Sequence, residues 1–206
     1  GERGWSRKLA FTRTTFNYKI RNAFEDNELI AFSDIEDLTA KFTVGKDSIL
    51  MGGGITAGLE LINHKVSPNI LNSEGSYTQL FESSTSDGKD ATEVAGHIQQ
   101  ELPLNDRLLM SIGFRGSFAI VDSRTFFTPE PRFAVRYALG ERESLKLSYS
   151  RMAQYIHRIS NSAVSTPTDI WYPVTERVRP QTSHQFALAW QKFASEKDIF
   201  LSAEAY

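Results

Sequence analysis

The sequence predicts an all-β fold, an antiparallel up-and-down meander of about nine strands. Two observations carry this prediction. Apolar residues recur at every second position along most of the chain, whereas helical periodicity is poor, and short charged turns alternate with longer linkers. The clearest stretch is Leu108–Ile120, "LLMSIGFRGSFAI", in which one face is apolar and the other is small, polar or charged.

The first four strands are predicted in the N-terminal half. The first lies near Arg7–Ala23, where a one-residue slip in the alternation before Phe16 suggests a β-bulge. The second lies near Ser33–Val44 and is followed by a tight turn at "GKDS". The third runs from Ile49 to Leu61, and the fourth lies near Thr92–Leu102.

The turn "PLNDR" leads into the fifth strand, Leu108–Ile120, and four more strands follow it. The sixth strand is Arg132–Leu139, and the turn "GERES" connects it to the seventh, Leu145–Ser150. The eighth is Gln185–Gln191, and the turn "ASEKD" precedes the ninth, which begins at Ile199. In each of these strands an apolar face opposes a polar one.

The connections between these strands are expected to sort by length. The short turns fall at one end of the sheet, and longer linkers at residues 24–32, 64–91, 121–130 and 156–182 fall at the other. Outer-membrane barrels have this layout, with short periplasmic turns and longer external loops.

Strand length indicates a membrane crossing. Thirteen residues, as in Leu108–Ile120, span roughly 43 Å at about 3.3 Å per residue, or roughly 33 Å when tilted by about 40°. That length crosses the hydrocarbon of a bilayer. Because bacterial barrels have an even number of strands, we expect residues 1–206 to be part of a larger transmembrane β-barrel.

Composition excludes several other classes of protein. The net charge of −2 gives no basic field for nucleic acid, and no run of about 18 apolar residues forms a membrane helix. The four histidines, His64, His97, His157 and His184, lack metal-ligand spacing, and no Gly-x-Ser-x-Gly hydrolase motif is present. We therefore expect no enzyme, no metal site and no cofactor.

Several motifs gather in the second half of the chain. They are "IGFRGSF", "PEPRFAVRYALGERESLKLSYSRMAQYIHRISNS", "STPTDIWYP", "RPQTSHQFALAW" and the final "LSAEAY". Together these motifs cover roughly residues 93–206, and the set resembles the TonB-dependent receptors of the bacterial outer membrane, in particular the type common in Bacteroidetes. The first third of the chain matches by architecture only.

The resemblance implies a barrel of about 22 strands, plugged by a separate N-terminal domain. It also implies uptake of a scarce nutrient, such as a siderophore or a glycan, driven by the TonB complex. We expect these residues to supply wall, lumen and external loops, with the plug domain preceding Gly1. The implied partners are outer-membrane lipid, the plug domain and the TonB complex, and a surface lipoprotein is left open.

Two groups of residues are candidates for function. Asp169, Trp171 and Tyr172 lie in a proline-rich loop and could contact a ligand, although the same loop could instead fold inward and pack, with Trp171 as an anchor. Polar residues on the face opposite the apolar one are expected to line the lumen: Thr56, Glu60, Ser111, Arg115, Arg136, Lys146, Ser148 and Gln185.

Two other functions stay open at this point. One is an outer-membrane channel or assembly barrel that does not depend on TonB. The other is a soluble all-β module that binds carbohydrate, in which the apolar faces would form a dry core between two stacked sheets. The positions of Ile112, Phe114 and Phe118 discriminate the second alternative from a membrane barrel.

Overall fold

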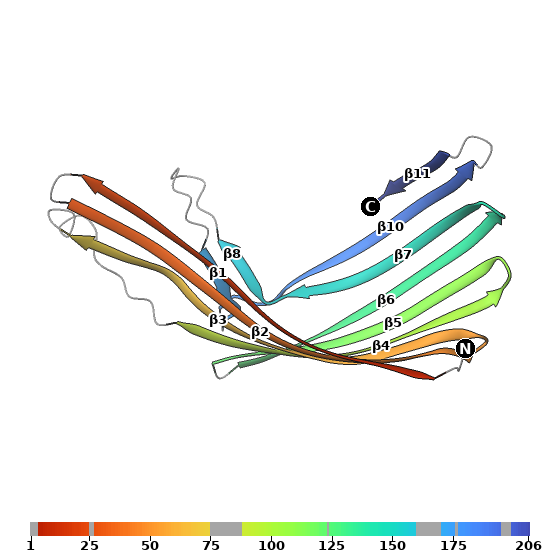
Figure 1. The fold of residues 1–206 in the computed structure, drawn as a ribbon, viewed down its shortest axis with the longest axis horizontal. Helices are drawn as coiled ribbons and strands as arrows, with labels where there is room; N and C mark the ends of the chain where they lie inside the picture. The colour runs from red at the N-terminus through yellow and green to blue at the C-terminus, as the bar shows by residue number, and fades with distance from the viewer. Residues whose placement is uncertain are drawn as a thin grey trace.

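The chain folds into one large curved sheet and one small hairpin (Figure 1). The computed structural model describes residues 4–24, 27–74, 88–122, 124–159, 170–175, 177–194 and 199–206. Within these ranges, no helix combines the length and the apolarity needed to cross a membrane.

Nine strands form the large sheet, and each pairs antiparallel with its neighbour in the order β1-β2-β3-β4-β5-β6-β7-β10-β11. Their bounds are β1 (Trp5–Phe24), β2 (Asn27–Leu50), β3 (Gly53–Glu74), β4 (Lys89–Asn105), β5 (Leu108–Val121), β6 (Arg124–Gly140), β7 (Glu143–Gln154), β10 (Gln181–Ala194) and β11 (Ile199–Ala205). Strands β8 (Ile156–Ile159) and β9 (Ile170–Pro173) pair with each other in the connection between β7 and β10. The predicted meander of nine strands is confirmed.

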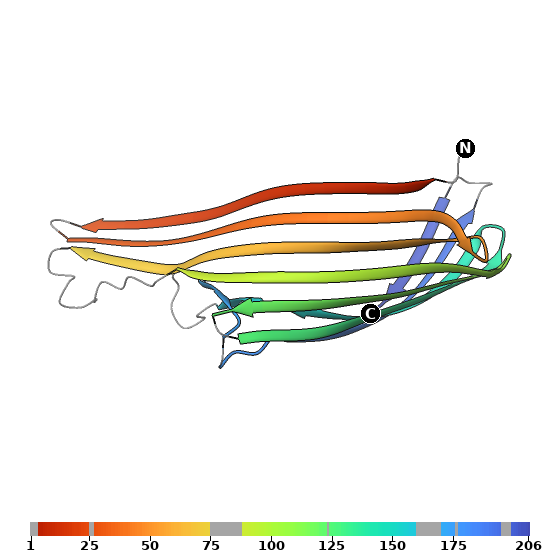
Figure 2. The ribbon, with the colours of Figure 1, turned by 90° about the horizontal axis from the view of Figure 1, so that it is seen from below.

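The first three strands are longer than a membrane crossing requires. β1, β2 and β3 have 20, 24 and 22 residues, whereas β5 has 14. A tilted transmembrane strand needs about 9–11 residues. In Figure 2 these three strands reach well beyond the ends of β5 and β6 on the side away from the short turns. We call this part, residues 14–24, 27–37 and 64–74, the extension.

The predicted linkers are mostly wrong, because the strands continue through them. β1 and β2 stay paired to Phe24 and Asn27, and β5 and β6 to Val121 and Arg124. β3 likewise continues to Glu74. A neighbouring strand satisfies the backbone of these residues whatever their side chains are, so the loss of alternation did not end the strands.

The predicted turn at "GKDS" is also misplaced. Leu50 pairs with Gly53, so the turn is at Met51 and Gly52, which have φ angles of 54° and 84°. Two-residue hairpin turns favour positive φ at both central positions. An irregularity between Lys46 and Leu50 moves the turn away from the charged residues.

The bulge predicted in the first strand is absent. β1 pairs with β2 without a register shift from Trp5 opposite Lys46 to Phe24 opposite Asn27. Because successive residues of a strand point to opposite faces, Phe16 lies on the face opposite Phe11. The slip in the alternation therefore marks a change in which face is apolar.

The sheet is curved, and its two faces differ. The convex face carries apolar side chains on every strand of the large sheet, including Phe11, Leu59 and Phe114, which are 75%, 63% and 46% exposed. On β3 this apolar band runs from Ile55 to Leu61. It ends at Asn63, whose Nδ2 donates to Thr92 Oγ1 at 3.2 Å.

The concave face carries the polar residues of the same strands and is partly covered by the hairpin. The β8–β9 hairpin lies inside the curve of the sheet (Figure 1) and contacts β3 and β4. Its flanking residues Tyr155 and Val174 are buried against Ala91, Ala119 and Val121, which form the small core of the described chain. This contact fixes the hairpin above the concave face.

Candidate functional site

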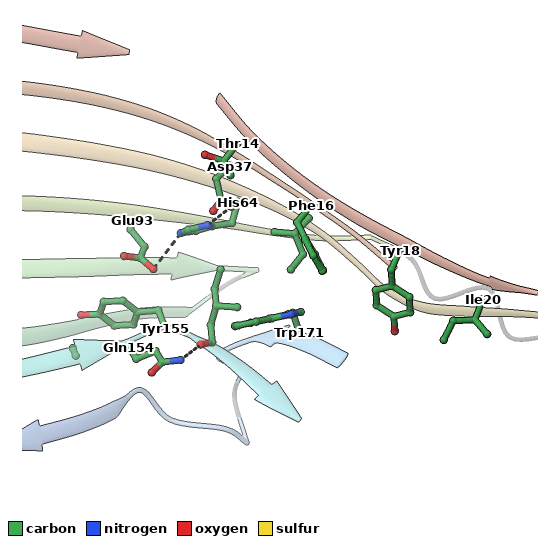
Figure 3. A pocket seen from close by; sticks show the side chains of 13 residues that line it. Thr14, Phe16, Tyr18, Ile20, Asp37, His64, Glu93, Gln154, Tyr155 and Trp171 are labelled. Atoms are coloured by element: carbon green, nitrogen blue, oxygen red, sulfur yellow. Dashed lines mark hydrogen bonds and ion pairs between the residues drawn. The ribbon is translucent and has the colours of Figure 1, made fainter. Parts of the chain in front are cut away.

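A cavity of about 830 Å³ lies on the concave face, between the extension and the β8–β9 hairpin (Figure 3). Strands β1 to β4 form one wall, and the end of β7 together with the hairpin forms the other. The lining residues that the structure describes are Thr14, Phe16, Tyr18, Ile20, Ile35, Asp37, His64, Glu93, Ala153, Gln154, Tyr155, Ile156 and Trp171. Its size is in the range of pockets that hold small molecules.

The wall formed by the extension is apolar and aromatic. Phe16, Tyr18 and Ile20 alternate along β1 and therefore point to the same side, and Ile35 of β2 pairs with Phe16. The rings of Phe16 and Tyr18 lie 6.5 Å apart and are tilted by 55°. Trp171 enters the cavity from β9 (Figure 3). Such surfaces bind ring systems and alkyl chains by burial of apolar area.

The polar part of the cavity is built from three neighbouring strands. Asp37 of β2 and Glu93 of β4 flank His64 of β3, with Asp37 Oδ1 at 2.7 Å from Nδ1 and Glu93 Oε1 at 3.2 Å from Nε2. The second contact is close enough for an ion pair but lacks the geometry of a hydrogen bond. His64 is only 6% exposed.

Protonation of His64 follows from these contacts. The residue lies beyond the apolar band, one position past Asn63. Burial lowers the pKa of His64, but the contacts with Glu93 and Asp37 raise it by more, so the pKa lies above its usual 6.5. The imidazolium form is therefore favoured between the two carboxylates.

The hairpin is held in place by a buried tyrosine. Tyr155 OH lies 2.7 Å from Ser117 Oγ and donates to Ser117 O at 3.3 Å. Val174 N donates to Tyr155 O at 2.8 Å, and Val174 is fully buried. Because the hairpin carries Trp171, these contacts fix the position of that side of the cavity.

The concave face continues below the cavity as a network of charges. Glu130, 2% exposed, accepts from Arg115 Nη1 at 2.7 Å and from Ser117 Oγ at 2.6 Å. Arg115 also donates to Glu60 Oε2 at 3.2 Å, and Lys41 Nζ lies 3.6 Å from Glu60 Oε1. Ser117 thus joins this network to Tyr155 of the hairpin.

Of the three residues that the sequence suggested as ligand contacts, one lines the cavity. Trp171 lines the cavity. Tyr172, the next residue of β9, pairs with His157 and does not line it. Asp169 lies outside the described residues. The hairpin does fold inward, but its buried residues are Tyr155, Pro173 and Val174, and Trp171 is partly exposed.

The eight residues predicted to line the lumen share the concave face. The pairing places them in one set of alternate positions, and the set is Thr56, Glu60, Ser111, Arg115, Arg136, Lys146, Ser148 and Gln185. Glu60 and Arg115 belong to the charge network. That this face borders an aqueous lumen stays a prediction.

Sequence reasoning missed most of the cavity. Phe16, Tyr18 and Ile20 gave a signal, the shifted alternation, which was interpreted as a bulge. Asp37 and Glu93 meet His64 only through strand pairing, and their spacing in the sequence carries no signal. Across the described part of the chain, no three potential ligands converge as a metal site.

Comparisons with known proteins bear on the fold. No family model matches the chain, and no curated protein matches it. Among solved structures, the chain is similar to the ferripyoverdine receptor of the outer membrane of Pseudomonas aeruginosa bound to ferripyoverdine. The TM-score is 0.63 and the identity 10%, over 92% of this chain and 29% of that one.

Two further structures agree with this result. The complex of FpvAI with pyocin S2 has a TM-score of 0.63 and an identity of 10%, with 93% of this chain and 29% of that chain covered. The alcaligin outer-membrane receptor FauA from Bordetella pertussis has a TM-score of 0.57 and an identity of 13%, with 96% and 36% covered. The chain thus spans about a third of the length of these receptors.

The three matches cover between 92% and 96% of this chain. A match at such low identity bears on the fold alone. The chain has the fold of a segment of the β-barrel of TonB-dependent outer-membrane receptors.

Proposed function

We propose that this chain forms wall, lumen and external surface of a bacterial outer-membrane receptor that imports a nutrient in a TonB-dependent manner. The observation that carries the proposal is the reversal of polarity along β1. Its convex face is apolar at Leu9 and Phe11 and polar at Asn17 and Lys19, while its concave face changes from Lys8 to Phe16 and Tyr18.

A membrane accounts for the first half of this pattern. Lipid favours apolar side chains over the whole height of the crossing, and a water-filled interior accepts charged ones. On β5 the convex face is apolar from Leu108 to Ile120, roughly 33 Å along the membrane normal at a tilt of about 40°. Residues Glu60, Arg115 and Glu130 then lie inside the barrel.

A ligand site accounts for the second half. The extension projects beyond the apolar band, where its convex face meets water and carries Asn17 and Lys19. Its concave face would have no reason to be aromatic if it also met only water. The cavity lined by Phe16, Tyr18 and Trp171 is the place where this receptor captures its nutrient.

The proposal includes partners outside this chain. A plug domain would fill the barrel and contact the charged concave face around Arg115, and the TonB complex would act through the plug. Open edges at β1 and β11 would pair with the other strands of the barrel, since lipid does not satisfy a free backbone group. The Bacteroidetes type of receptor and a surface lipoprotein stay predictions.

The test uses the full-length protein that contains this chain. Cells lacking its gene and cells lacking TonB are expected to stop depleting the same compound from a nutrient-limited medium, measured by mass spectrometry of the culture supernatant. Depletion that needs the gene but not TonB would favour a simple channel or an assembly barrel. Depletion that needs neither contradicts the receptor.

The soluble carbohydrate-binding module is disfavoured by exposure. Ile112, Phe114 and Phe118 are 46%, 46% and 44% exposed on the convex face. In the described part of the chain, the only other sheet is the β8–β9 hairpin, which packs on the opposite face. A dry core between two stacked sheets is therefore not formed by these residues.

A further inference from the structure

The cavity has an unbalanced charge. Asp37, Glu93 and His64 are the described lining residues that carry charge near neutral pH, and no lysine or arginine is among them. With His64 protonated, the group still holds one net negative charge.

Neighbouring cations do not correct this imbalance. Lys19 and Lys65 lie on the convex face of the same strands, pointing away from the cavity. Lys89 lies on the concave face at the edge of β4, but its Nζ is 3.6 Å from Asp122 Oδ2. Arg115 contacts Glu60 and Glu130. Among the described lining residues no lysine or arginine stands beside these carboxylates, so any bound ligand meets them without such a compensating cation.

A buried polar atom also points to a ligand. His64 Nε2 is shielded from solvent and meets no hydrogen-bond partner among the residues that the structure describes. Its Nδ1 is occupied by Asp37 at 2.7 Å. Glu93 Oε1 lies 3.2 Å from Nε2 as an ion pair. A carboxylate has further acceptor sites, so Glu93 can also accept a hydrogen bond from a bound group.

The aromatic wall of the cavity attracts positively charged groups, as the carboxylates do. The faces of aromatic rings carry partial negative charge and attract cations such as ammonium and guanidinium groups. Phe16, Tyr18 and Trp171 supply such rings within the same cavity as Asp37 and Glu93. Both halves of the site thus favour positive charge.

We propose that the cavity selects ligands that combine an apolar ring with a cationic amino or guanidino group, and that it disfavours anionic ligands of the same shape. The ring packs on Phe16, Ile35 and Trp171, and the cation is held by Glu93 and Asp37. An anionic ligand would place like charges together in a partly buried site, where water screens them less than at the surface. This inference rests on the proposed function of the cavity and adds the charge class of its ligand.

Two dyes with the same ring system and opposite charge test this directly. Rhodamine 6G is cationic and fluorescein is dianionic, and both are xanthenes. Fluorescence polarisation is measured with the full-length protein in detergent, and the signal of protein-free micelles is subtracted. We expect rhodamine 6G to bind at least about tenfold more tightly than fluorescein.

Three variants test whether the difference in affinity between the two dyes arises in the cavity. Asp37→Asn combined with Glu93→Gln is expected to weaken rhodamine 6G binding by about tenfold or more. Phe16→Ala is expected to weaken binding of any dye that enters the cavity. Glu36→Gln is the matched control, because Glu36 adjoins Asp37 but lies on the convex face, and it is expected to change nothing.

The outcomes separate this inference from the proposed function. Fluorescein binding that equals or exceeds rhodamine 6G binding, and that weakens in Phe16→Ala, overturns the charge class but leaves the cavity as a ligand site. Rhodamine 6G binding that is unchanged in the double variant overturns the inference, as does binding of neither dye. The depletion measurement decides the receptor function independently of the dyes.

Discussion

The part of β1 that would cross the membrane in the proposed barrel and the part in the extension differ in which face is apolar, although one continuous strand forms both. Leu9 and Phe11 lie on the convex face, which meets lipid in the proposed barrel, whereas Phe16 and Tyr18 lie on the concave face and line the cavity. The backbone and its pairing with β2 are the same on both sides of Arg13. The difference teaches that the surroundings of each face, and not the fold of the strand, decide where apolar residues are placed.

The largest expected effect is the loss of stability when the buried ion pair of Glu130 is removed. In the crossing part, Glu130 is 2% exposed and holds Arg115 and Ser117. Replacing it in Glu130→Ala leaves a partly buried guanidinium without its main partner, which typically costs about 3–5 kcal/mol. Urea unfolding of the full-length protein in lipid vesicles, followed by tryptophan fluorescence, measures this loss.

An exposed pair at the boundary of the extension serves as the comparison. Glu36 lies 2.8 Å from Arg13 Nε on the convex face, with side chains 24% and 67% exposed. Glu36→Ala is expected to cost less than about 1 kcal/mol. Equal losses in the two variants would contradict the distinction between a shielded interior and a solvated surface.

The next largest effect concerns the convex face itself. Phe114→Arg places a charge in the apolar band near its middle, and we expect a loss of about 2–4 kcal/mol in folding free energy. Asn17→Arg places the same charge on the convex face of the extension, where it meets water, and should stay within about 0.5 kcal/mol. Heat-modifiable mobility of the barrel in electrophoresis reports the folded fraction. A similar loss in both would mean that the extension also lies in lipid.

A smaller effect on stability is expected from the contact that holds the β8–β9 hairpin on the concave face. Tyr155→Phe removes the hydroxyl that contacts Ser117, at a cost of about 1 kcal/mol. Because the rest of the ring remains packed, the barrel should stay intact while the hairpin opens more often. Hydrogen exchange of β8 and β9 measures this, and unchanged protection there would show that the hydroxyl contributes nothing.

The smallest effect is a pH dependence confined to the extension. The contacts with Glu93 and Asp37 outweigh burial and hold the pKa of His64 above 6.5. The stabilisation is therefore complete below pH 6.5 and is lost as pH rises through the raised pKa of the folded state. Exchange protection of β3 around His64 should fall over that range, and His64→Gln should remove the dependence. Constant protection in the wild-type protein would contradict this assignment.

The sequence was sufficient for the fold because a strand with one apolar and one polar face has a simple alternating pattern. Strict alternation at Leu108–Ile120 predicts a strand with one apolar face, and the structure has β5 at Leu108–Val121. The concave position of Arg115 followed from the same alternation. The strand and the face of Arg115 could both be predicted from the local alternation of apolar and polar residues alone.

The cavity was less accessible to prediction because it depends on contacts between distant strands. Asp37, His64 and Glu93 meet through the register of β2, β3 and β4, which the sequence does not state. The slip before Phe16 was visible, but a bulge and a reversal of polarity produce the same pattern. Only the continuous pairing of β1 with β2 separates the two interpretations.

Spin labelling along β1 tests the reversal of polarity most directly. The chain has no cysteine, so single cysteines at positions 9, 11, 16, 17, 18 and 19 of the full-length protein can carry a nitroxide without removing native thiols from this segment. Frequent collisions of the nitroxide with oxygen indicate that the label lies in lipid. Frequent collisions with a water-soluble nickel chelate indicate that it lies in water. We predict that labels at Leu9 and Phe11 contact lipid and that labels at Asn17 and Lys19 contact water. Lipid contact at Phe16 and Tyr18, with Asn17 and Lys19 turned inward, would contradict the account.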